Sequence, residues 1–302
     1  MIEVRKAKLD DTQQISQLFQ ERVEVWQRFN AEGQVESPPY DELSIYERWL
    51  HGGAWMSIET SAIFLSHLLC GGGLPFVAIQ DSRIVGYAET YTGTEPEPYG
   101  EYLHIGHLLA NSEAAQQALI QHILKQAKRI TAAFSSYDRD SAAFYGQYDF
   151  KELKQIKQYT LPAQSGQSFY QATEHKDTRF PQGWHMSIGR EQSARQHWEM
   201  LWHRLWDALP EITAQKTERL KFSAAGQEAF VCYQQQLYSP RTANVYCWSP
   251  KPLTTQLLVA IRDWAYRQNY RTLILPVTEE TVKLFGNDAE STPYQQTIYA
   301  RT

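Results

Sequence analysis

The chain has 302 residues and a net charge of −5, and 42% of its residues are hydrophobic. This length predicts two domains with packed cores, and the composition shows no sign of disorder. The acidic balance argues against a dedicated nucleic-acid binder, and no apolar run is long enough to span a bilayer. Three scattered cysteines are too few for a disulfide framework or a zinc site. We therefore expect a cytoplasmic protein that holds no metal ion and has no membrane or nucleic-acid partner.

The N-terminal part of the chain predicts a strand, several helices and a hairpin. Helical periodicity and capping residues predict helices over 12–29, 40–51 and 60–69. Apolar and β-branched runs predict strands over 2–7, 74–80 and 83–90. The last two strands are separated only by Asp81 and Ser82, so we expect them to form a hairpin.

The central stretch of the chain organises the rest. Apolar and aromatic residues over 101–110 predict a buried strand. Asn111 and Ser112 follow, and both are good N-caps because a side-chain oxygen accepts from a free amide in the first helical turn. A helix is expected over 113–129, and a second strand over 130–136. Strand, crossover helix and strand form a βαβ unit, whose strands are expected to be parallel.

Three short motifs follow the order and spacing of a known family. Residues Phe144 to Phe150, FYGQYDF, resemble the FYEKLGF segment of the GCN5-related N-acetyltransferases. Residues Arg83 to Glu89, RIVGYAE, resemble the third strand of that family. The opening from Ile2 to Thr12 resembles the usual opening of the family. The resemblance covers residues 1 to about 160, which is half of the chain.

The resemblance implies a fold of the α+β or α/β class. Each domain would have a mixed, mostly antiparallel, twisted sheet with a central parallel βαβ splay and flanking helices. The second half repeats this order of elements, with strands over 229–237 and 243–248, a helix over 252–268 and a strand over 271–277. We therefore expect two tandem domains of this fold, 1–162 and 163–302, separated by the small polar stretch 163–168. A generic α/β second domain is the alternative.

The resemblance also implies a binding site for acetyl-CoA. The pyrophosphate of the cofactor needs backbone amides at a helix N-terminus, and its pantetheine arm would lie in a gap beside the middle strand. The matching residues are Leu108, Leu109, Ala110, Ser112, Glu113, Ala114 and Ala115. This turn departs from the family's phosphate loop, Q/R-x-x-G-x-G/A, because it has no glycine and no arginine. The side chain of Glu113 also adds a negative charge there, and Pro250 and Pro252 remove two amide donors from the equivalent turn of the second half.

Acetyl transfer to an amine needs a proton acceptor and benefits from a proton donor. Glu89 and Glu101 match positions of family glutamates on or near the central strand, and His104 is a third candidate acceptor. The structural alternative is a solvated carboxylate or a buried histidine with satisfied hydrogen bonds. Tyr145 matches the family tyrosine that protonates the departing thiolate, and packing is its alternative role. The equivalent residue of the second half is Phe285, which has no proton to give, so the first half is the expected catalytic half.

Two functional interpretations follow. In the first, the chain is an N-acetyltransferase that moves an acetyl group from acetyl-CoA to a small amine, and the second half shapes the acceptor pocket. In the second, the chain is a catalytically decayed protein of this fold that serves as a ligand-binding or assembly module. The absence of the phosphate loop from both halves favours the second interpretation, whereas Tyr145 favours the first. The 18 tyrosines and 9 tryptophans also permit a homodimer.

Overall fold

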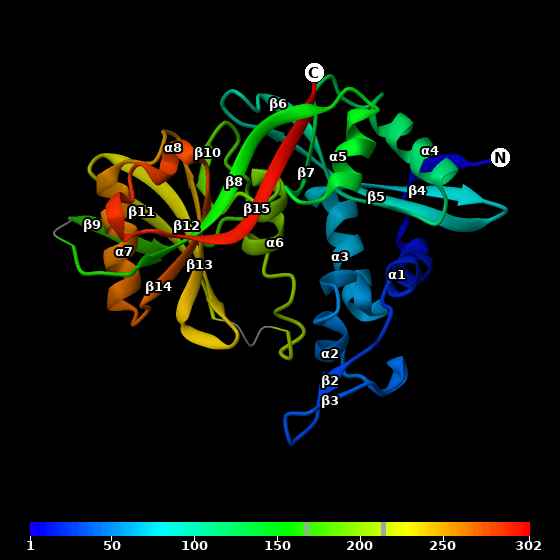
Figure 1. The fold of residues 1–302 in the computed structure, drawn as a ribbon, viewed down its shortest axis with the longest axis horizontal. Helices are drawn as coiled ribbons and strands as arrows, with labels where there is room; N and C mark the ends of the chain where they lie inside the picture. The colour runs from blue at the N-terminus through cyan, green and yellow to red at the C-terminus, as the bar shows by residue number, and fades with distance from the viewer. Residues whose placement is uncertain (167–168, 213–215) are drawn as a thin grey trace. The chain divides into compact units, whose positions relative to one another are not determined.

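The computed structural model of the chain describes residues 1–166, 169–212 and 216–302. Figure 1 traces the chain through two compact units that alternate along the sequence. Unit 1 consists of Met1–Tyr91, Ile105–Ala127 and Leu205–Ala214. Unit 2 consists of Thr92–His104, Lys128–Arg204 and Gln215–Thr302. Among the described helices, none combines the length and the apolar character needed to cross a lipid bilayer.

The predicted domain boundary lies within unit 2. Residues 167 and 168 of the predicted linker are outside the described ranges. Earlier in the linker, Ala163 is buried, and the amide of Gly166 donates to Asp263 Oδ1 at 3.0 Å. The division of the chain at 162 and 163 stays a prediction.

The sheet of unit 1 contains a tight hairpin. Strand β1 (Glu3–Lys6) pairs antiparallel with β4 (Leu74–Gln80), and β4 pairs antiparallel with β5 (Arg83–Thr94). The two-residue turn expected between β4 and β5 is confirmed, because Asp81 and Ser82 have φ angles of +50° and +65°. This left-handed pair of residues matches the twist that a two-residue hairpin requires. Strand β6 (Glu101–Ala110) follows β5 in the strand order, and its residues 105–110 belong to unit 1.

Helices and aromatic side chains pack on this sheet. The helices of unit 1 are α1 (Thr12–Gln20), α2 (Ile45–Trp49), α3 (Ile58–His67) and α4 (Glu113–Ile123). In the core, the ring centroid of Trp55 lies 5.4 Å from that of Phe19, 5.4 Å from that of Phe64 and 4.9 Å from that of Tyr87. Trp206 packs on the outer side of this cluster, 6.3 Å from Phe64 between centroids. Helix α4 is shorter than the predicted helix.

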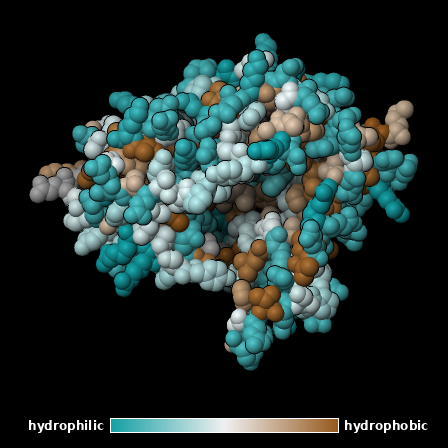
Figure 2. Space-filling view, viewed as in Figure 1, coloured by the Kyte–Doolittle hydropathy of each residue, from teal (hydrophilic) through white to brown (hydrophobic). Residues whose placement is uncertain are grey.

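A small second sheet belongs to unit 1. It consists of β2 (Arg28–Phe29) and β3 (Val35–Glu36). Phe29 and Val35 are cross-strand partners, and both side chains are exposed. Figure 2 shows hydrophobic surface over this hairpin, at the lower end of the view.

Unit 2 is built on a long, mostly antiparallel sheet. Its strand order is β7-β15-β8-β14-β13-β12-β11-β9, and β10 pairs with β13. The bounds are β7 (Ile130–Ser135), β8 (Lys151–Pro162), β9 (Tyr170–Glu174), β10 (His185–Ile188), β11 (Thr217–Ala224), β12 (Gln227–Gln236), β13 (Ser239–Ser249), β14 (Thr272–Val277) and β15 (Glu290–Arg301). Strands β13 and β14 run parallel over three residue pairs, from Thr242 opposite Thr272 to Asn244 opposite Ile274.

The last strand of the chain lies between strands from the first half of the sequence. β15 pairs with β7 over Gln296–Arg301 and with β8 over most of its length. Figure 1 shows β8 in green beside β15 in red. At its other end β8 pairs with β14, from Lys157 opposite Val277 to Pro162 opposite Thr272. The two halves of the sequence therefore share one set of strands within unit 2.

Two helices cover opposite faces of the unit 2 sheet. The helices of unit 2 are α5 (Arg139–Gly146), α6 (Ala194–Trp202), α7 (Thr255–Arg267) and α8 (Glu279–Val282). Helix α7 buries Leu257, Ile261 and Ala265 in one core. Helix α6 buries Trp198 and Trp202, whose rings stack at 4.1 Å, in a second core with Trp248. Alternate residues of the central strands contribute to the two cores, as expected for a sheet covered on both faces.

The order of elements repeats along the chain. The first half contains β6, α4, β7, α5 and β8, and the second half contains β13, α7, β14, α8 and β15. Each crossover helix begins at a residue whose side chain accepts an amide hydrogen bond, Ser112 for α4 and Thr254 for α7. The expected α+β fold with two tandem repeats is confirmed.

Candidate functional site

The predicted phosphate-binding turn lies at the N-terminus of α4, in unit 1. Leu108, Leu109 and Ala110 are half-buried at the end of β6. The Oγ of Ser112 accepts from the amide of Ala115 at 3.3 Å, so the predicted N-cap is correct. Within the described residues, no acceptor is bonded to the amides of Glu113 and Ala114. These two donors and the helix dipole give the turn a positive electrostatic character.

Two side chains modify the charge at this turn. The carboxylate of Glu113, which was expected to oppose an anion, accepts from Gln117 Nε2 at 2.9 Å, further along the helix. Arg22 Nη2 donates to the carbonyl oxygen of Ala110 at 2.6 Å, two residues before the N-cap. Sequence reasoning missed Arg22, because it is far from the turn in the chain and belongs to no local motif. The structure therefore supplies an arginine to a turn whose own sequence has none.

Glu89 is a buried carboxylate in unit 1. Its side chain is 1% exposed, accepts from Trp55 Nε1 at 3.3 Å and accepts a short hydrogen bond from the hydroxyl of Tyr91. No cationic side chain of the described ranges forms an ion pair with it. A buried carboxylate without a cation is costly, and such groups are more frequent at functional sites than elsewhere.

The two other candidate proton acceptors belong to unit 2 and differ in their surroundings. Glu101 is exposed at the first residue of β6. His104 is 1% exposed, and its Nδ1 lies 3.0 Å from Thr131 Oγ1 while its Nε2 lies 2.9 Å from Gln192 Oε1. Both ring nitrogens of His104 therefore have hydrogen-bond partners. This matches the alternative to catalysis, a buried histidine with satisfied hydrogen bonds.

Tyr145, the candidate proton donor, lies on α5 in unit 2. Helix α5 is capped by Asp138, whose Oδ1 accepts from the amide of Ser141 at 2.9 Å. The ring of Tyr145 stacks on Phe134 with centroids 5.6 Å apart, and only 8% of the residue is exposed. Burial, together with the charge of Asp138, raises the pKa of the Tyr145 phenol above its ordinary value. The phenol is therefore protonated at neutral pH, and the raised pKa makes it a weaker acid than a solvent-exposed tyrosine.

The chain itself fills the equivalent gap of the second half. Beyond Asn244 and Ile274 the parallel pairing of β13 and β14 stops, and the end of β13 pairs instead with β10. In this pairing His185 lies opposite Ser249, and Met186 lies opposite Trp248. The amide of Gly189 then donates to the carbonyl of Pro276 in β14 at 2.7 Å. Residues 185–189 therefore satisfy the backbone groups that an extended ligand would otherwise meet between the two strands.

Side chains also contact the turn before α7. Gln227 Nε2 donates to the carbonyls of Lys251 and Pro252, at 3.2 and 3.0 Å. Gln227 Oε1 in turn accepts from the hydroxyl of Thr254 at 2.9 Å. The prolines at 250 and 252 have no amide hydrogen, as the sequence predicted. These contacts use carbonyls and a hydroxyl of the turn, whereas the amides of Thr255 and Gln256, like those of Glu113 and Ala114, have no acceptor in the described part of the chain.

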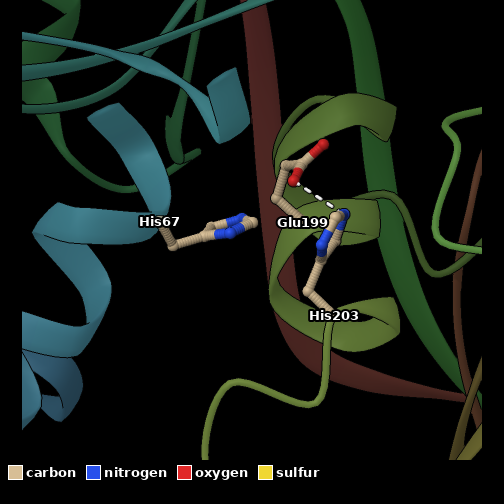
Figure 3. A group of neighbouring side chains, drawn as sticks. All are labelled: His67, Glu199 and His203. Atoms are coloured by element: carbon tan, nitrogen blue, oxygen red, sulfur yellow. Dashed lines mark ion pairs between the residues drawn. The ribbon is translucent and has the colours of Figure 1, made fainter. Parts of the chain in front are cut away.

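Helix α6 carries a second buried charge in unit 2. The carboxylate of Glu199 is 1% exposed and forms ion pairs with Arg195 at 2.5 Å and with His203 at 3.0 Å, one turn before and after it. Figure 3 shows the ring of His203 turned toward Glu199. The carboxylate of Glu199 differs from that of Glu89 because its own helix supplies the guanidinium of Arg195 as a cationic partner.

The comparisons with known proteins identify the fold. No protein-family model and no curated protein matches the chain. A GCN5-related N-acetyltransferase from Anabaena variabilis matches with a TM-score of 0.59 and 10% identity, over 99% of this chain and 72% of that one. One from Kribbella flavida matches with a TM-score of 0.56 and 9% identity, over 99% and 71%. A probable N-acyltransferase of unknown function from Enterococcus faecalis matches with a TM-score of 0.56 and 12% identity, over 99% and 72%.

The chain therefore has the fold of the GCN5-related N-acetyltransferases. Since the matches cover both halves, the expected tandem of domains with this fold is confirmed. The degenerate phosphate loop stays an interpretation of the sequence. At these identities the likeness concerns the fold alone.

The filled gap gives a prediction about Gly189. Its φ is +88°, and an added Cβ would lie 2.8 Å from the carbonyl oxygen of Val245 and 2.4 Å from the ring of Tyr246. We expect Gly189→Ala to lower the free energy of unfolding by about 2–4 kcal/mol, from backbone strain and overpacking together. Urea unfolding followed by tryptophan fluorescence measures the loss. Gly183→Ala is the control, because Gly183 has φ +77° with nothing within 4 Å of its Cβ. Equal losses for both variants would contradict tight packing of Gly189.

Proposed function

We propose that the chain is an N-acyltransferase that moves an acetyl group from acetyl-CoA to a small amine, with the cofactor site in the N-terminal repeat. The observation that carries the proposal is the fold, which the chain shares over 99% of its length with N-acetyltransferases. The closure of the C-terminal repeat by residues 185–189 supports the choice of the N-terminal one. The three cysteines are free, which supports a reducing cytoplasm as the location.

The start of α4 suits the phosphates of acetyl-CoA. It offers the amides of Glu113 and Ala114, and a helix of 11 residues stands behind them. Arg22 adds a guanidinium group beside Ala110, in a role that an arginine of the usual phosphate loop would have. The engagement of Glu113 with Gln117 reduces the repulsion that its charge would otherwise cause.

The remaining candidate residues have roles in proton transfer. When bound, acetyl-CoA would supply the thioester whose acetyl group passes to the amine. Glu89 would accept the proton that the amine loses as its bond to the acetyl carbon forms, and Glu101 is the second candidate. Tyr145 would give its proton to the sulfur atom as the carbon–sulfur bond breaks. Glu89 is buried without a cationic partner, which supports an amine substrate that enters the site as an ammonium ion.

The first test of the proposal is the binding of acetyl-CoA itself. A ligand that binds only the folded chain raises its melting temperature, and saturation at about 100 times Kd adds about 2.7 kcal/mol to stability. We expect such a rise, and we expect calorimetric titration to find one site per chain. Two sites would contradict the closure of the C-terminal repeat. An unchanged melting temperature at millimolar acetyl-CoA would favour the decayed, non-catalytic alternative.

Arg22 gives a second test. Replacement by methionine keeps the length of the side chain and removes its charge, so we expect Arg22→Met to weaken acetyl-CoA binding about 5- to 10-fold, or about 1–1.4 kcal/mol. The dissociation constant of the variant should also depend less on salt. Arg83→Met, a change at another exposed arginine of unit 1, is the matched control. Equal effects of the two substitutions would remove Arg22 from the site.

The third test concerns Tyr145. We expect Tyr145→Phe to lower kcat by about 100-fold or more, because proton donation typically contributes that much. The affinity for acetyl-CoA should change little, since the ring and its stacking on Phe134 remain. Steady-state kinetics and calorimetry separate the two effects. Tyr148→Phe, at a half-buried tyrosine that follows α5, controls for the loss of a phenol. An unchanged kcat would leave Tyr145 as a packing residue.

A further inference from the structure

A pocket of about 450 Å³ lies within unit 2, beside the segment that fills the C-terminal repeat. Its walls are the turn from Glu95 to Tyr99, strand β10, the start of the second repeat's crossover at Pro252 and Leu253, and helix α8. The volume is in the range of small-molecule sites. No residue of the α4 turn or of α5 lines it, so the inference goes beyond the proposed acetyl transfer.

A buried arginine provides the main polar group of this pocket. Arg190 is 4% exposed, its Nη2 donates to Glu95, and its guanidinium lies 3.9 Å above the ring of Tyr99. Glu95 is fully occupied, since its other oxygen accepts from the hydroxyl of Tyr102 at 2.7 Å. Among residues 1–166, 169–212 and 216–302, none accepts from Nε or Nη1 of Arg190. The guanidinium therefore retains donors, and it lines the pocket.

The other polar groups divide into free donors and occupied acceptors. His185 and Ser187 line the pocket from β10, and in the described chain neither the ring of His185 nor the hydroxyl of Ser187 has a hydrogen-bond partner. The carboxylates at the rim are already paired, Glu97 with Arg129 at 3.2 Å and Glu280 with Lys154 at 2.7 Å. A ligand would thus meet donors that need an acceptor, rather than acceptors that need a donor.

The shape of the site is held by contacts that do not depend on a ligand. Arg129 Nη1 donates to the carbonyls of Pro98 and Tyr99, at 3.1 and 2.7 Å, and so fixes the turn that forms one wall. The pairing of β10 with β13 fixes the opposite wall. Leu253 and Leu284 add apolar surface. Such preorganisation lowers the cost of binding a small molecule.

We propose that this pocket binds a small organic carboxylate, with the carboxylate on the free donors of Arg190, His185 and Ser187 and a short apolar chain against Leu253 and Leu284. A planar carboxylate matches the geometry of a guanidinium edge. An ammonium ion has no lone pair to accept hydrogen bonds from these donors. A neutral alcohol could accept one hydrogen bond but carries no negative charge to add to that of Glu95 beside Arg190.

The test compares three probes of equal chain length. Hexanoate, hexylammonium and hexanol are titrated into the full chain, and binding is followed by saturation-transfer NMR. We expect saturable binding of hexanoate at millimolar concentrations, at least 10-fold tighter than that of the other two probes. Equal binding of all three would reduce the pocket to an apolar crevice, and preferential binding of hexylammonium would overturn the proposal. Absence of hexanoate binding would also overturn it. These outcomes are independent of whether acetyl-CoA binds or reacts.

A pocket-filling variant locates the site. Thr281 lines the pocket from α8, and we expect Thr281→Trp to weaken hexanoate binding at least 10-fold by occupying the volume. Asn287→Trp is the matched control, an exposed neutral residue six positions later that does not line the pocket. Circular dichroism checks that both variants are folded. Unchanged binding by Thr281→Trp, or an equal loss in both variants, would assign the binding to another surface.

Discussion

The pairing of β10 with β13 is the interaction on which the structural difference between the two repeats of this chain depends. Parallel strands β13 and β14 separate after three residue pairs, which leaves backbone groups on both strands without partners from each other. Buried backbone groups must be satisfied. Strand β10 satisfies those of β13, and the amide of Gly189 reaches the carbonyl of Pro276 on β14. A segment of the chain thus contacts both strands where they separate, and a pocket remains beside this segment.

The C-terminal repeat remains necessary because the two halves share strands. β15 from the end of the chain lies between β7 and β8 of the first half, and β8 also pairs with β14 of the second. Removal of either half would leave long unpaired strand edges in the other, which are costly and prone to association. This arrangement gives a physical reason for a second repeat to persist after its gap has been filled. It also explains why the compact units do not follow the order of the sequence.

The sequence predicted the local features of the fold because local residues determine them. Ser112 begins α4, and Asp81 with Ser82 forms the hairpin turn, as the capping and turn rules require. The predicted helix over 113–129 ends early, at Ile123, and Arg129 instead lies beside β6, where its carbonyl accepts from the amide of Leu103. Arg22 and Gly189 could not be predicted as functional, since each acts on a partner at least 87 residues away in the chain. The pairing of β10 with β13 is equally non-local, and no motif marks it.

The turns before the two crossover helices, α4 and α7, occupy the same position of the repeat but are surrounded by different side chains. Before α7, Gln227 takes the carbonyls of Lys251 and Pro252 and the hydroxyl of Thr254, so side chains of unit 2 use the polar groups of the turn. Before α4, Ser112 uses one amide, Glu113 turns to Gln117, and Arg22 adds a positive charge. A helix N-terminus attracts an anion only when its amides are free and nearby charges do not oppose the dipole. In the described part of the chain the first two amides of both helices lack an acceptor, so the two ends differ in their side chains, Glu113 with Arg22 at α4 and Gln227 at α7. Neither turn carries the glycines of the usual loop. The difference between the two helix ends therefore lies in the side chains around them, since neither end has the motif.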